Sequence, residues 1–215
     1  MNIPSDIHTH LLPSVPGQAV VNSPSLRFHP QPGQWYSVGV HPWESGSAVC
    51  AEELEQAVRH PQVLAIGETG ADKLAGVSMD RQLEVFRLHA RLGMATGKPL
   101  LIHAVKAAAG LLELKKTMRP HNTWIIHGFR GKAQLAEMYL AHGFCLSFGE
   151  RFQPEALRLT PSDRLFLETD ESVVSIDRIY AMAAAVRQTS ADSLKHTVAC
   201  NVGRLMSEAG LYPSF

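Results

Sequence analysis

Short apolar runs alternate along most of the chain with segments in which apolar residues recur every three or four positions. Eight of the runs predict strands, because they are short and end at polar or turn-forming residues. They span residues 2–7, 19–21, 35–40, 63–66, 99–102, 123–126, 144–148 and 164–167. The helical spacing predicts helices over 48–59, 79–95, 106–118, 132–142, 176–188 and 191–208. Repeated strand–helix units of this kind predict an α/β protein with a parallel sheet.

Eight strands in one chain predict a closed (β/α)8 (TIM) barrel that occupies residues 1–215 as a single domain. A typical barrel has about 250 residues, so this one is expected to be trimmed. The stretch between the first and third strands has no room for a crossover helix and contains Pro24, Pro30 and Pro32. We therefore expect the early crossover helices to be missing or shortened. An open, doubly wound sheet is the alternative fold.

Charge is balanced over the chain, with 20 Lys and Arg against 20 Asp and Glu. Such a chain has no global attraction for nucleic acid or anionic membranes, which still allows a local basic rim around a site. The three scattered cysteines contain no Cys-x-x-Cys motif, which indicates a reducing compartment and argues against a thiolate zinc cluster. No apolar run approaches the roughly 20 residues of a membrane helix, and no signal-peptide pattern is evident. We expect a cytoplasmic protein without membrane contact.

The first predicted strand leads into Asp6-Ile7-His8-Thr9-His10. Alternate side chains of an extended strand point to the same face, so that His8 and His10 project together, about 6–7 Å apart. Neutral imidazole is a common ligand for zinc and related metals. Taken alone, the pair is equally compatible with solvated or hydrogen-bonded histidines. Whether the pair binds a metal depends on which residues stand at the ends of the other predicted strands.

Four more residues with nitrogen or oxygen ligand atoms follow later strands, namely Glu68, His103, His127 and Asp170. The carboxyl ends of the strands of a barrel converge on one face, where active sites lie. Six such residues are more than one tetrahedral zinc requires. They predict two divalent ions, Zn, Mg or Mn, about 3.5–4 Å apart.

The two carboxylates have distinct expected roles in this site. Glu68 is expected to bridge the ions, because it is the carboxylate of the middle strands. His8, His10 and Asp170 would hold one ion, and His103 with His127 would hold the other. Asp170 and Glu68 are also the predicted catalytic residues, since Asp170 can orient the attacking water or accept its proton.

Other polar residues after the strands are candidates for contacts to a substrate. His41 ends the third predicted strand and could donate to a phosphate or a leaving group. Lys73, Lys106 and Arg130 fall in later loops, where they could form a cationic rim for phosphate oxygens. Two aromatic residues in the same loops could stack on a base or pack in the core: Trp43 and Phe129.

Taken in order, these motifs resemble those of the TatD-like metal-dependent hydrolases of the amidohydrolase superfamily. The matching segments are 6–10 (DIHTH), 38–43 (VGVHPW), 65–72 (AIGETGAD), 98–103 (KPLLIH), 125–129 (IIHGF) and 167–170 (LETD). The resemblance extends over nearly the whole chain, including residues 201–206. It implies a (β/α)8 barrel, a divalent-metal centre and hydrolysis of phosphodiester bonds, as in the DNases and 3′–5′ exonucleases of this family.

The chain departs from the usual family pattern beside the ligands. Arg130 stands where the sixth-strand motif usually has Ser, and Glu171 and Ser172 stand where a small residue and Pro usually follow the last Asp. Val105 and Lys106 replace the usual Arg and Asp of the fifth-strand motif. With the short loops after the first and last strands, the chain resembles a short subgroup of the family. The metal ligands are retained, whereas the substrate contacts differ.

The leading prediction is a two-metal-dependent hydrolase of the TatD type, a deoxyribonuclease or exonuclease that acts on DNA or another phosphodiester. The first alternative is an amide, lactone or phosphotriester hydrolase with the same binuclear site. The second is a non-catalytic metal-binding barrel that acts through interactions.

Overall fold

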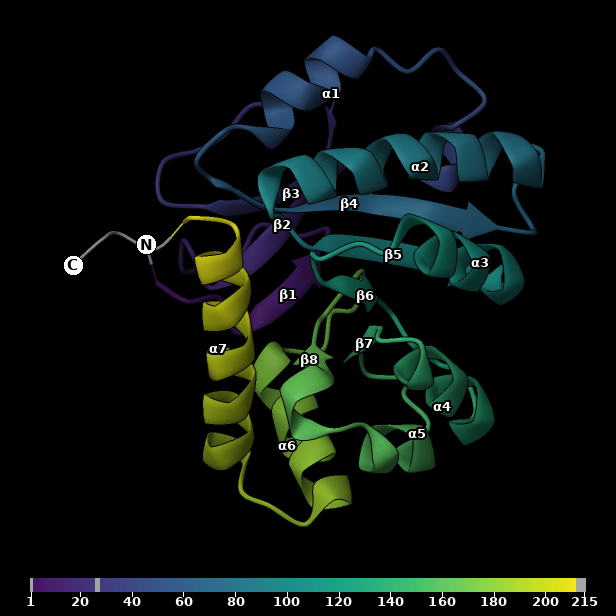
Figure 1. Ribbon diagram of the computed structural model, residues 1–215. Coiled ribbons are helices and arrows are strands. Elements are labelled where there is room, and N and C mark those ends of the chain that lie inside the picture. The colour runs from purple at the N-terminus through teal and green to yellow at the C-terminus, as the bar shows by residue number, and fades with distance from the viewer. Residues whose placement is uncertain (1, 26–27, 212–215) are drawn as a thin grey trace.

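Eight parallel strands form one sheet, in which the spatial order of the strands is their order in the chain (Figure 1). The computed structural model describes residues 2–25 and 28–211. The strands are β1 (Asp6–Thr9), β2 (Ala19–Pro24), β3 (Trp35–Gly39), β4 (Val63–Asp72), β5 (Leu100–Val105), β6 (Trp124–Ile126), β7 (Cys145–Phe148) and β8 (Leu165–Leu167). The predicted eight-stranded parallel α/β architecture is confirmed.

The sheet closes into a barrel at a seam between β1 and the segment that follows β8. Thr9 and Asp170 form a parallel bridge there. The N–H of Asp170 donates to the carbonyl of His8 at 2.9 Å, and the N–H of His10 donates to the carbonyl of Asp170 at 3.0 Å. These bonds join the two ends of the sheet at the carboxyl face of the barrel. A barrel therefore forms rather than the open sheet.

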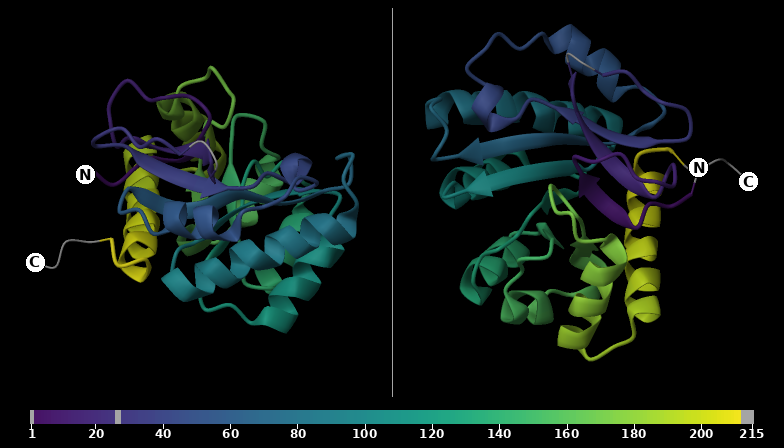
Figure 2. Two further views of the ribbon diagram at one scale, coloured as in Figure 1. Left: turned by 90° about the horizontal axis from the view of Figure 1, so that it is seen from above. Right: turned by 180° about the vertical axis from the view of Figure 1, so that it is seen from behind.

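Helices follow the strands from β3 onward. They are α1 (Ala51–Val58), α2 (Met79–Thr96), α3 (Ala108–Met118), α4 (Ala133–Ala141), α5 (Pro154–Leu159), α6 (Ile176–Arg187) and α7 (Ala191–Glu208). Figure 1 shows α2 lying along β4. Within the described residues, the connections from β1 to β2 and from β2 to β3 contain no α-helix, and β1 and β2 have no helix in front of them in the view from behind (Figure 2). The early crossover helices are therefore missing, as predicted.

Two strands are longer than their apolar runs. β4 extends to Asp72 and β5 to Val105. Glu68 and His103 therefore lie within strands, whereas the sequence analysis placed them after the strands. The sequence also missed α5, which has six residues and shows too few turns to display a helical period. No described helix combines the length and apolar character that spanning a membrane requires.

Glycines allow β4 to lie unusually close to β5 beside Glu68. Gly67 has a φ of 155° and Gly70 a φ of 146°, backbone conformations that residues with a Cβ rarely adopt. A Cβ on Gly67 would lie 2.6 Å from the carbonyl oxygen of Leu101, and one on Gly70 would overlap the carbonyl of His103. Both positions therefore require glycine, and the close approach brings Glu68 next to His103.

His89 of α2 fixes the end of β3 from outside the barrel. Its Nε2 accepts a hydrogen bond from the N–H of Val40 at 3.0 Å, and its Nδ1 lies 2.8 Å from the carbonyl oxygen of Val85. The side chain is fully buried, and burial lowers the pKa of His89 to about 4. Neutral His89 donates through Nδ1 and accepts through Nε2, so both bonds require the uncharged ring.

We predict that His89 makes the stability of the fold depend on pH. Because its pKa lies near 4 in the folded chain and near 6.5 in the unfolded chain, the unfolded chain binds more protons between these values, and stability falls as the pH falls through them. Between pH 7 and pH 5, the free energy of unfolding of the wild type should drop by about 2 kcal/mol relative to that of His89→Gln. Urea titrations at both pH values measure this difference. His121→Gln, on an exposed histidine, is the control, and an equal pH dependence in all three proteins would contradict the prediction.

Candidate metal centre

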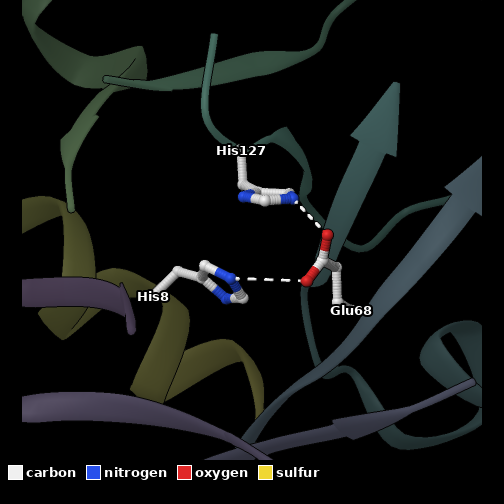
Figure 3. A group of neighbouring side chains, drawn as sticks. All are labelled: His8, Glu68 and His127. Atoms are coloured by element: carbon white, nitrogen blue, oxygen red, sulfur yellow. Dashed lines mark hydrogen bonds and ion pairs between the residues drawn. The ribbon is translucent and has the colours of Figure 1, made fainter. Parts of the chain in front are cut away.

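The candidate centre lies at the carboxyl ends of the strands, around the buried side chain of Glu68. Five imidazoles surround this carboxylate. Oε1 lies 2.8 Å from Nδ1 of His103, 2.8 Å from Nε2 of His127 and 3.3 Å from Nε2 of His41, and Oε2 lies 3.4 Å from Nε2 of His10 and 3.6 Å from Nε2 of His8. Figure 3 shows His127 and His8 each directed at a different oxygen of Glu68. The carboxylate is thus shared between two groups of histidines.

Three overlapping sets of side chains have ligand atoms close enough to hold a cation. In each set these atoms lie within 4.8 Å of one another. The sets are His8, Glu68 and His127; His8, His10 and Asp170; and His41, Glu68 and His103. The second set contains the three residues expected to hold the first ion. The third set adds His41, which the sequence suggested as a substrate contact.

His8 provides the test of whether a cation fits. Both of its ring nitrogens are buried, and neither has a hydrogen-bond partner among the described residues. Its Nε2 lies 3.6 Å from Glu68 and 3.7 Å from Asp170, which is too long for hydrogen bonds. Burial, together with the nearby charge of His127, lowers the pKa of His8 to about 3, so the ring is neutral and retains a lone pair. A buried polar atom without a partner is costly, and a divalent cation between this nitrogen and the two carboxylates would satisfy it.

The carboxylates of the centre differ in their electrostatics. Burial alone would raise the pKa of Glu68, but the charge of His127 and hydrogen bonds from His10 and His103 hold it well below its usual range. These contacts favour the ionised carboxylate of Glu68. Burial raises the pKa of Asp170 above its usual value, partly offset by His127. Asp170 is accordingly the stronger base of the two.

Three acidic residues lie behind the centre, and two of them hydrogen-bond to its histidine rings. Glu168, fully buried, accepts hydrogen bonds from the N–H of Gly128 at 2.6 Å and from Nδ1 of His127 at 3.3 Å. Oδ2 of Asp72 lies 3.0 Å from Nε2 of His103. Carboxylates that hold the outer nitrogen of a ligand histidine fix its tautomer and direct the other nitrogen to the metal.

The third acidic residue, Asp6, secures the seam. Its carboxylate accepts hydrogen bonds from the N–H and the hydroxyl of Thr169, at 3.0 and 2.6 Å, and from the N–H of His8 at 3.3 Å. The sequence analysis assigned no role to Asp6, Asp72 or Glu168. Each lies within four residues of a predicted ligand in a quoted motif, and this proximity was the available signal.

The predicted substrate contacts occupy different positions relative to the centre. A cleft of about 940 Å³ opens over it and is lined by His41, Lys106 and Arg130, among others. The guanidinium of Arg130 lies 3.6 Å from the carboxylate of Asp170. Lys73 is exposed and does not belong to the lining of this cleft.

Comparison with known proteins agrees with the motifs. A family model described as "TatD related DNase" matches residues 26–207. A Mycobacterium tuberculosis protein named "uncharacterized metal-dependent hydrolase TatD" is 34% identical over 149 residues, which cover 62% of this chain and 56% of the relative. An Erwinia amylovora protein named "3′–5′ ssDNA/RNA exonuclease TatD" is 31% identical over 150 residues, covering 63% and 57%. The matched part thus spans little more than half the length of these relatives.

The fold has a close counterpart among solved structures. The crystal structure of the TatD homologue YjjV from Escherichia coli K12 superposes with a TM-score of 0.80 and covers 94% of this chain and 97% of that one, at 19% sequence identity. That likeness confirms the barrel fold. The family model spans most of the chain and includes four of the six predicted ligands, and the resemblance of the motifs is thereby confirmed. The chain belongs to the family of TatD-related DNases.

Proposed function

We propose that this protein is a hydrolase that requires two divalent metal ions and cleaves phosphodiester bonds. The observation that carries the proposal is buried His8, whose ring nitrogens have no hydrogen-bond partner among the described residues and whose Nε2 faces two carboxylates. In the proposed site, His8, His10 and Asp170 would hold one ion, His103 and His127 would hold the other, and Glu68 would contribute to both. The position of His41, 3.3 Å from Glu68, supports it as a further ligand of the second ion.

The bound ions would supply Lewis acidity, which lowers the pKa of water and neutralises charge that develops on a phosphoryl group. Side chains of the protein would accept the proton and orient the histidines. Asp170, whose pKa is raised by burial, would accept the proton of the attacking water. Glu168 and Asp72 would keep His127 and His103 in the tautomers that ligation requires.

Single-stranded nucleic acid is the substrate class that we propose. Arg130 and Lys106 line the cleft, and guanidinium and ammonium groups bind phosphate oxygens. The exonuclease named above supports the same class for this chain. Carboxamides, lactones and phosphotriesters are the competing substrates, and a panel of these compounds tested beside end-labelled DNA would distinguish them.

We predict that Glu68→Gln loses both metal and activity. The neutral amide removes the charge that holds two cations together, so metal content should fall below about two ions per chain. Turnover of end-labelled single-stranded DNA should fall by at least about 100-fold, beyond the 10- to 100-fold typical of an outer partner. Elemental analysis and a cleavage assay measure the two quantities. Glu53→Gln, on the exposed face of α1, is the matched control, and unchanged metal content with unchanged turnover would refute the bridging role.

We predict that Arg130 contacts a phosphate. The logarithm of the binding constant for single-stranded DNA should fall linearly with the logarithm of the salt concentration, by about 0.7 for each phosphate contact. Arg130→Gln should reduce this slope by about 0.7. Arg87→Gln changes an exposed arginine of α2, away from the cleft, and should leave the slope as it is. Equal slopes in the wild type and Arg130→Gln would remove Arg130 from the interface.

A further inference from the structure

Trp43 differs from the other tryptophans of the chain in being exposed. Trp35 and Trp124 are buried, with 3% and 0% of their surface accessible, whereas Trp43 is 59% exposed. It lies in the short 3-10 helix Pro42–Glu44, directly after β3, and lines the cleft over the metal centre. A large aromatic ring in water calls for an explanation, because burial would stabilise it by a few kcal/mol.

The ring is held in place although it is exposed. Its Nε1–H donates to Oδ2 of Asp72 at 2.8 Å. Asp72 is in turn fixed, because its Oδ1 accepts from the N–H of Leu74 at 2.7 Å and its own N–H donates to buried Gln82 at 2.7 Å. The exposed indole is thus anchored at one edge where it lines the cleft. It therefore loses little conformational entropy when a planar group binds to its ring.

Hydrogen bonds also link the same ring to the metal centre. Oδ2 of Asp72 is 3.0 Å from Nε2 of His103, and Nδ1 of His103 is 2.8 Å from Glu68. A single imidazole thus separates the indole anchor from the carboxylate at the middle of the centre. A planar group on Trp43 would lie beside a phosphate at the centre.

Core packing does not account for Trp43 as it does for Phe129. Phe129 is buried and makes edge-on contacts with Tyr139 and Phe148, so it belongs to the core. Among the described residues, Trp43 makes no such contact with another aromatic ring. Both aromatic candidates line the cleft, but Trp43 is the exposed one, so its ring is the one accessible for stacking.

We infer that Trp43 is the stacking platform for the unpaired base of the nucleotide whose phosphate reaches the metal centre, with Asp72 as the positioning residue that orients the platform and His103 together. The inference rests on the proposed function. Stacking on an aromatic side chain accepts any base, because every base has a π-face. The platform therefore adds affinity for single-stranded ends without selecting a sequence.

Intrinsic fluorescence gives a direct test, because Trp43 is the exposed tryptophan. The probes are a phosphorothioate pentamer of thymidine, which resists hydrolysis, and a matched abasic pentamer of equal charge. The thymidine pentamer should quench the emission of the wild type, and the abasic pentamer should bind about tenfold more weakly or worse, as the loss of one stacked base predicts. Binding to the variants, which lack the Trp43 signal, is followed by the fluorescence anisotropy of the same probes carrying a 5′ dye, and in Trp43→Leu the two probes should bind equally. Trp43→Phe keeps an aromatic face without the anchor and should retain part of the preference for the thymidine pentamer.

The outcomes separate the inference from the function on which it rests. If Trp43→Leu, folded as judged by its urea midpoint, still prefers the thymidine pentamer tenfold, or if neither probe binds the wild type, the platform is refuted. Cleavage of an ordinary end-labelled pentamer by the metal-loaded wild type is measured separately. Cleavage without an effect of Trp43→Leu on binding refutes the platform and leaves the hydrolase. A base preference that depends on Trp43, without cleavage of any phosphodiester, supports the platform and refutes the hydrolase.

Discussion

Backbone hydrogen bonds between β1 and Asp170 close the barrel and assemble the centre at the same time. The bonds join His8 and His10 to a residue 160 or more positions later in the chain. Asp170 takes a left-handed conformation, with a φ of 56°, which a residue with a Cβ adopts only when its surroundings hold it there. The carboxylate of Asp6 helps to hold Asp170 in this conformation, because it accepts two hydrogen bonds from the neighbouring Thr169. The same hydrogen bonds therefore fix both the geometry of the centre and the closure of the barrel.

Charge in the centre is arranged around a single buried anion. Glu68 attracts five histidines from four strands or strand ends, yet His8 remains neutral because its burial outweighs that attraction. A neutral buried imidazole beside two carboxylates has no good partner within the protein. A divalent cation would give it one, and the same cation would relieve the repulsion between Glu68 and Asp170. Burial and charge therefore favour metal binding together.

Much of this arrangement could be predicted from local pattern. Apolar runs followed by His, Glu or Asp indicated where strands bring polar side chains to one end of the barrel, and the absence of helices before β3 followed from Pro24, Pro30 and Pro32. The full length of β4 could not be predicted, because this strand continues through Gly67 and Gly70, residues that usually end a strand. Only the close approach of two backbones makes glycine necessary there.

The sequence by itself determined the kind of fold and the chemical class of the ligands, because both follow from the spacing and type of residues close together in the chain. Tertiary structure decided which nitrogen of His103 and of His127 faces the centre, since Asp72 and Glu168 orient these two rings from distant parts of the chain. It also decided that His89 supports the end of β3 from α2, and that Trp43 is exposed while Phe129 is buried. Each of these depends on a partner far away in the sequence, and local pattern carries no information about such partners.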